Sequence, residues 1–201
     1  METGESGPSR RALLRTGAYL GATSLSVATA SAVARAGERR GTVRPIPDWI
    51  PASASNYTVS SRPSAYSVEF VIVHVTQVSF QNARKIFQNP AKKVSAHYMV
   101  ASADGYTAQF VREKDIAWHA GNWDYNTRSV GIEHEGWVDR PKYFTDALYE
   151  SSAALTAAVC DRYGLPKDRD HVIAHSEVPG ATHTDPGRYW NWDRYMELVN
   201  R

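Results

Sequence analysis

Seven histidines carry most of the side chains with which this chain could do chemistry. They stand at positions 74, 97, 119, 134, 171, 175 and 183. Several fall at the ends of predicted strands or helices, where side chains can face a cleft. Because an imidazole can bind a metal ion or move a proton near neutral pH, these histidines are the first candidates for an active site.

The single cysteine, Cys160, restricts the kind of site that the histidines can form. It excludes an intramolecular disulfide and every zinc site that needs two or more thiolates, including that of the zinc deaminases. A bound metal must therefore be held by His, Asp or Glu. No local motif identifies the ligands. His134 lacks the second histidine of a metalloprotease helix, and no Gly-x-Ser-x-Gly elbow is present for a serine triad at Ser176.

The overall composition favours one globular domain. Of 201 residues, 42% are hydrophobic and 22% are charged, which is typical of neither a disordered chain nor one built mainly of membrane spans. The 23 Lys and Arg against 21 Asp and Glu leave a formal net charge of +2. This balance argues against nucleic-acid binding through bulk charge.

The first 34 residues are predicted to be an export signal peptide rather than part of the folded domain. Arg10 and Arg11 precede a weakly apolar stretch over residues 16–34, a pattern typical of a twin-arginine export signal. Eight of those 19 residues are small and polar or glycine, which argues against a stable membrane anchor. We therefore expect a protein that is secreted or associated with the cell wall.

Residues 35–66 are rich in Pro, Ser, Ala and Arg and are predicted to form a linker and N-terminal extension. We expect this segment to become ordered near Trp49, Asn56 and Tyr57. The catalytic domain is then expected over residues 67–201.

The rest of the chain alternates between strand and helix patterns. Strands are predicted over residues 68–75, 96–102, 106–112, 128–135 and 171–174. Helices are predicted from Ser79 to the residue before Pro90, over residues 146–163 and around residues 191–199. These elements predict an α/β domain with a central mixed sheet flanked by helices. Cys160, Trp190 and Trp192 are expected to pack in the core of this domain.

Four separated segments together resemble a known family. They are Val71-Ile72-Val73-His74-Val75-Thr76-Gln77, Ala117-Trp118-His119-Ala120-Gly121, Ser129-Val130-Gly131-Ile132-Glu133-His134-Glu135-Gly136, and Ala174-His175-Ser176 followed by His183-Thr184-Asp185-Pro186-Gly187. In this order they resemble the zinc-dependent N-acetylmuramoyl-L-alanine amidases, whose fold is shared with peptidoglycan-recognition proteins and with a phage amidase called a lysozyme. The resemblance extends from about Trp49 to the C-terminus.

The resemblance implies one zinc ion held by His74, His175 and Asp185. Two imidazoles and one carboxylate suit zinc and leave a fourth position for water. It also implies that Glu133 is the general base, although strand alternation places Glu135 on the same face and leaves that residue as an alternative.

His183 occupies a position where many relatives have a lysine that stabilises the oxyanion. A histidine there can donate a hydrogen bond, but it would lose its charge as the pH rises, which a lysine would not. We therefore expect activity to be more sensitive to alkaline pH than in a lysine enzyme.

The expected substrate is peptidoglycan, cut between N-acetylmuramic acid and L-alanine. Trp118, His119, Asn126 and His97 are expected to bind it, with Tyr98 also lining the cleft, because aromatic rings and amides suit a sugar joined to a peptide. Packing of Trp118 and Trp123 over the core is an equally open alternative.

Two other functions remain open from the sequence. One is a peptidoglycan-binding module without catalysis, and the other is a zinc peptidase that cuts within the stem peptide. We expect a monomer.

Overall fold

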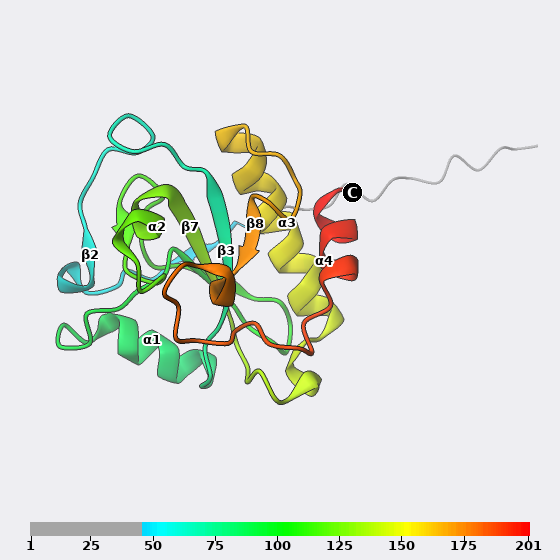
Figure 1. The fold of residues 1–201 in the computed structure, drawn as a ribbon. Helices are drawn as coiled ribbons and strands as arrows, with labels where there is room; N and C mark the ends of the chain where they lie inside the picture. Colours follow the sequence, from blue (N-terminus) through cyan, green and yellow to red (C-terminus); the bar gives the residue numbers. More distant parts are fainter. Residues whose placement is uncertain (1–45) are drawn as a thin grey trace, which may run out of the picture. The chain divides into compact units, whose positions relative to one another are not determined.

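The computed structural model describes residues 46–201, so the predictions for the export signal and the start of the linker lie outside the described residues. The main sheet has six strands in the order β1-β5-β4-β7-β3-β8. Its neighbouring strands β7, β3 and β8 can be followed in Figure 1. Its strands are β1 (Asp48–Trp49), β3 (Phe70–Val75), β4 (Tyr98–Val100), β5 (Thr107–Gln109), β7 (Ser129–His134) and β8 (Val172–Ala174). Strands β4, β7, β3 and β8 run parallel, whereas β5 is antiparallel to β4. The sheet is therefore mixed, as predicted.

Strand β3 is covered on both faces, which explains its nearly continuous run of apolar residues. Val71, Val73 and Val75 belong to the cluster that packs against helices α3 (Asp146–Tyr163) and α4 (Trp192–Val199). Ile72 lies on the opposite face, in a smaller cluster. His74 shares that opposite face because side chains alternate along a strand. Alternation thus carries His74 away from the main core.

Helix α3 has the bounds that the sequence predicts. The Thr145 hydroxyl accepts a hydrogen bond from the backbone N–H of Leu148 at 3.2 Å and so caps its N-terminus. Gly164 follows with φ of 67°, the left-handed conformation that ends many helices. Cys160 is fully buried in this helix, and Trp190 packs into the same core, as expected.

Helix α1 (Phe80–Gln88) packs on the other side of the sheet, where Phe80 and Phe87 contact Phe110. Ser79 is its N-cap residue, as predicted, but its hydroxyl makes no capping hydrogen bond. The carboxylate of Glu135 accepts the bond from the N–H of Phe80 instead, at 2.9 Å.

The folded domain begins before residue 67, so the predicted domain boundary is too late. Strand β1 pairs with β5, and β2 (Tyr57–Thr58) pairs with β6 (Ile116–Ala117) in a second, two-stranded sheet. Arg62 is buried, with 5% of its surface exposed. The strands of this segment are only two residues long, so they leave no periodic pattern, and its Pro and Ser residues favoured a linker instead.

The remaining elements are short, and the sequence did not predict them. They are α2 (Trp123–Arg128) and the 3-10 turns η1 (Ala54–Asn56), η2 (Pro141–Tyr143) and η3 (His175–Glu177). Between residues 46 and 201, no helix is long and apolar enough to cross a membrane.

Candidate active site

Three potential metal ligands meet at one edge of the sheet. His74 is the second-last residue of β3, and His175 follows the last residue of β8, its parallel neighbour. Because parallel strands end at the same edge, the topology brings the two rings together, with centroids 4.4 Å apart. Asp185 arrives from the loop after η3 and accepts a hydrogen bond from the backbone N–H of Val75 at 3.2 Å.

The geometry of this cluster fits a zinc ion. Asp185 Oδ2 lies 3.3 Å from Nδ1 of His74, and Asp185 Oδ1 lies 3.0 Å from Nδ1 of His175. Donor atoms bound about 2.0–2.1 Å from a tetrahedral ion lie roughly 3.3 Å from each other. All three side chains are buried, and their ligand atoms lie within 4.8 Å of one another.

The electrostatics also suit a cation. Burial alone would raise the pKa of the Asp185 carboxyl, but its hydrogen bond with His175 holds that pKa well below its usual range. Burial lowers the pKa of His74, which favours the neutral ring. A carboxylate and neutral imidazoles are the protonation states that bind a metal.

Glu133 lies beside the cluster with an unused oxygen. It pairs with His74 in the register of β7 and β3, so both side chains lie on the same face. Its Oε2 atom is buried and has no hydrogen-bond partner. Burial and the nearby Asp185 raise the pKa of Glu133 well above the ordinary value, which favours a carboxyl that can hold a proton.

Glu135, the alternative general base, is occupied elsewhere. Its Oε1 accepts the N–H of Phe80 at 2.9 Å, and its Oε2 accepts the N–H of Ser102 at 3.0 Å. Both oxygens therefore hold backbone segments in place. Glu133 is the carboxylate of this pair that is left for chemistry.

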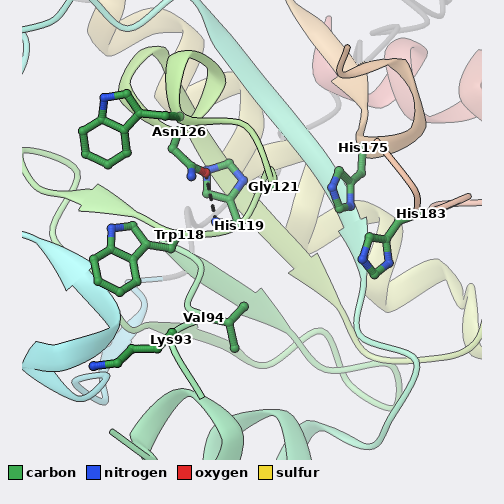
Figure 2. A pocket seen from close by; sticks show the side chains of 9 residues that line it. Lys93, Val94, Trp118, His119, Gly121, Asn126, His175 and His183 are labelled. Atoms are coloured by element: carbon green, nitrogen blue, oxygen red, sulfur yellow. Dashed lines mark hydrogen bonds between the residues drawn. The ribbon is translucent and has the colours of Figure 1, made fainter. Parts of the chain in front are cut away.

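A pocket of about 520 Å³ opens beside these residues (Figure 2). The predicted residues that line it are Trp118, His119, Asn126, His175 and His183. Figure 2 shows His175 and His183 on one side of the pocket, and Trp118 and Lys93 across from them. Trp123, for which the sequence left a groove role and core packing open, also lines it, as does Lys93, which no sequence pattern singled out. The available signal for Lys93 was a lysine just before a predicted strand.

Different hydrogen bonds fix the positions of the residues that line the pocket. The side chain of Trp118 donates its Nε1–H to the hydroxyl of Thr58 at 3.0 Å. Asn126 uses its Oδ1 to accept the backbone N–H groups of His119 and Ala120, at 3.0 and 2.8 Å. Asn126 therefore shapes the loop that carries His119, in addition to lining the pocket.

His183 is exposed and stacks on His175. The two ring centroids are 5.0 Å apart, and the ring planes differ by 16°. This arrangement leaves the His183 ring at the solvent side of the cluster, facing the pocket. An imidazole N–H at this position can donate a hydrogen bond into the pocket.

The prediction that His97 binds substrate is wrong. His97 is fully buried; its Nδ1 accepts the N–H of Gly131 at 3.0 Å, and its Nε2 lies 3.2 Å from the carbonyl oxygen of Asp115 and 2.6 Å from Arg62. With both ring nitrogens in use, no donor or acceptor remains for a ligand. Tyr98 is also buried, in the face that packs against α3, rather than in the pocket.

Two further buried polar residues brace the site. Arg62 donates to the carbonyls of Glu113, Asp115, Thr127 and Ser129 at distances of 2.6 to 3.1 Å. His134 contacts the carbonyl oxygen of His74 through Nδ1 at 2.7 Å and the hydroxyl of Ser152 through Nε2 at 2.6 Å. No sequence pattern distinguished Arg62 from a surface arginine.

Comparisons with known proteins find a matching family and similar sequences. Residues 63–188 match a family described as N-acetylmuramoyl-L-alanine amidase. The chain is 36% identical to N-acetylmuramoyl-L-alanine amidase A of Achromobacter lyticus over 169 residues, which cover 76% of this chain and 92% of that protein.

Two solved structures have a fold similar to that of this chain. A crystal structure of a selenomethionine derivative of AmpD has a TM-score of 0.63 and 27% identity, covering 76% of this chain and 94% of its own. AmpDH3 from Pseudomonas aeruginosa, solved in complex with anhydromuramic pentapeptide, has a TM-score of 0.56 and 25% identity. That match covers 69% of this chain and 62% of AmpDH3.

Proposed function

This chain belongs to the N-acetylmuramoyl-L-alanine amidase family, and on that premise we propose how it works: one zinc ion held by His74, His175 and Asp185 supports hydrolysis of the amide between N-acetylmuramic acid and L-alanine in peptidoglycan. The observation that carries the proposal is the buried His-His-Asp cluster beside the unpartnered Oε2 of Glu133. When bound, zinc supplies Lewis acidity and makes water a nucleophile near neutral pH.

Glu133 is the residue that moves protons in this proposal. Its carboxylate takes a proton from the attacking water and returns it to the leaving amine nitrogen. The raised pKa of Glu133 suits this role, because a group that both accepts and donates a proton must not be strongly acidic. Its place across the strand pairing from His74 keeps it next to the ligands.

His183 supports the developing negative charge on the carbonyl oxygen. Its ring faces the pocket from beside His175, and an imidazole N–H can donate a hydrogen bond to an oxyanion. Trp118 and Trp123 offer ring faces on which a sugar can stack. The pocket thus provides apolar surface for the glycan and polar groups for the peptide.

We further propose that residues 1–34 export the protein to the cell wall through a twin-arginine route. The paired Arg10 and Arg11 and the following weakly apolar stretch support this. Fusing residues 1–34 to a reporter tests it. Export that is lost when both arginines become lysine supports the proposal, and a reporter retained in the cytoplasm contradicts it.

Mass spectrometry of the products from purified peptidoglycan tests the reaction. Treatment with the protein should release free stem peptides that begin at L-alanine, and a zinc chelator should stop the release. Fragments that begin within the stem peptide would identify a zinc peptidase instead. Polymer that is uncut but co-sediments with the protein would identify a binding module.

A further inference from the structure

His119 contacts a predicted zinc ligand rather than only facing the pocket. Its Nδ1 lies 2.9 Å from Nε2 of His74, and its Nε2 lies 3.3 Å from the hydroxyl oxygen of Ser129. The Ser129 hydroxyl in turn lies 2.5 Å from the carbonyl oxygen of Tyr125. These four residues form a chain of hydrogen bonds that starts at a backbone carbonyl and ends at His74.

The donor and the acceptor of each of these hydrogen bonds can be assigned by starting from the carbonyl oxygen of Tyr125. A carbonyl oxygen only accepts, so the single hydroxyl proton of Ser129 must point at Tyr125. Ser129 then accepts a proton from Nε2 of His119, and a neutral imidazole that donates through Nε2 accepts through Nδ1. His74 must therefore donate its Nε2–H to His119.

This leaves the Nδ1 lone pair of His74 directed at Asp185. The nitrogen and the carboxylate oxygen are two acceptors 3.3 Å apart, so they repel each other unless a cation lies between them. The hydrogen-bond chain thus prepares the metal side of His74 while acting on the opposite side of its ring.

We propose that His119 is a positioning residue that, through Ser129 and Tyr125, locks His74 in the tautomer that binds metal through Nδ1. This inference rests on the proposed zinc function. It assigns His119 a role beyond the substrate contact that the sequence predicted.

The packing around His119 leaves its ring one orientation. A Cβ atom on Gly131 would lie 2.6 Å from the His119 ring, so only glycine permits this approach. The ring also meets that of His74 edge to face, with centroids 5.0 Å apart. Asn126 fixes the His119 backbone. A ring held this way cannot turn to exchange its two nitrogens.

Nitrogen-15 NMR of the zinc-free protein tests the tautomer directly. The imidazole shifts should show the proton of His74 on Nε2 at pH 7.5. A proton on Nδ1 in the zinc-free protein would overturn the inference whatever the enzyme does with zinc.

Zinc affinity, measured by competition with a chromophoric chelator, tests the consequence. His119→Phe keeps the ring but removes both nitrogens, and it should weaken zinc binding about 10- to 100-fold, the usual cost of losing such a partner. His119→Asn can place Oδ1 near the former Nδ1 and should restore most of the affinity. His171→Ala, at a histidine that instead pairs with Asp168, is the control and should change nothing.

The outcomes separate this inference from the proposed function. Tight zinc binding by His119→Phe, or no recovery in His119→Asn, would overturn the role of His119 and leave the zinc amidase intact. A wild-type protein that binds no zinc would overturn the proposed function. The NMR spectrum of the zinc-free protein would still show which nitrogen of His74 carries the proton. Should His119→Phe fail to fold, Ser129→Ala should release the tautomer and weaken zinc binding, and unchanged affinity in that variant would contradict the inference.

Discussion

Glu133 lies directly opposite His74 in the parallel pairing of β7 and β3. Two neighbouring strands of the central sheet thus place the proposed proton-transfer group and a proposed metal ligand side by side. A paired strand holds its residues more rigidly than a loop does. The sheet itself therefore sets the relation between the two residues that matter most for the proposed hydrolysis.

Replacing Glu133 should separate catalysis from metal binding. Glu133→Gln is expected to reduce the rate of stem-peptide release by about 10²- to 10⁴-fold, because the amide cannot take the proton of the attacking water. Zinc affinity should stay near that of the wild type. Glu133 would not be the general base if the variant kept most of its activity.

Asp185 should be required for metal binding. Losing an outer-shell partner already weakens metal binding about 10- to 100-fold, so loss of the ligand carboxylate in Asp185→Asn should weaken it further. The zinc content of the purified variant measures this. Asp193→Asn, at an exposed aspartate, is the matched control. Full zinc occupancy in Asp185→Asn would contradict the assigned ligand set.

Removing the metal should also lower stability. A ligand that binds only the folded state stabilises it by mass action, so a chelator should lower the melting temperature of the wild type. The same chelator should leave the melting temperature of Asp185→Asn almost unchanged. An equal shift in both proteins would show that the chelator acts elsewhere.

His183 should limit activity at alkaline pH. A lysine keeps its charge to higher pH than a histidine does. His183→Lys is therefore expected to remain active and to extend the alkaline range in a pH–rate profile. A flat wild-type rate from pH 6 to pH 9 would count against a charged His183 in the reaction.

Protonation of His134 should destabilise the fold in acid. Burial lowers the pKa of His134 from 6.5 to about 3, so below pH 6.5 the unfolded chain binds a proton that the folded chain does not. The neutral ring thus makes its full contribution to the free energy of unfolding above pH 6.5. This contribution declines as the pH falls toward 3, by up to about 1.4 kcal/mol per pH unit.

Urea unfolding of the zinc-free protein measures this effect. The stability difference between the wild type and His134→Gln, whose amide does not titrate, should shrink by about 2 kcal/mol from pH 6.5 to pH 5. Parallel stability curves for the two proteins would refute the contribution of His134.

Arg62 should matter for folding although it lies outside the pocket. Its guanidinium donates to four backbone carbonyls in the interior at 3.1 Å or less, and the single ammonium group of a lysine cannot reach all of them. Arg62→Lys is expected to lower the free energy of unfolding by several kcal/mol, since carbonyls lose their buried partners. Arg140→Lys, at an exposed arginine, should have little effect.

Patterns within a few residues of each other were enough to predict the regular elements. The ends of α3 follow from Thr145 and Gly164, and the strand at His74 follows from its β-branched run, because caps and periodicity act over one or two turns. The same locality explains the misses, since strands of two residues around Trp49 and Tyr57 are too short to carry a period.

For the site, too, the sequence determined some features and the tertiary structure decided the others. The sequence determined that a metal would need His and carboxylate ligands, and the family resemblance singled out His74, His175 and Asp185. Contacts between distant residues decided the rest. They turned His97 toward Arg62, joined His119 to His74 across 45 residues, and tied Glu135 to backbone N–H groups. A hydrogen bond depends on the position and direction of both partners, and no spacing along the chain specifies those before the sheet has formed.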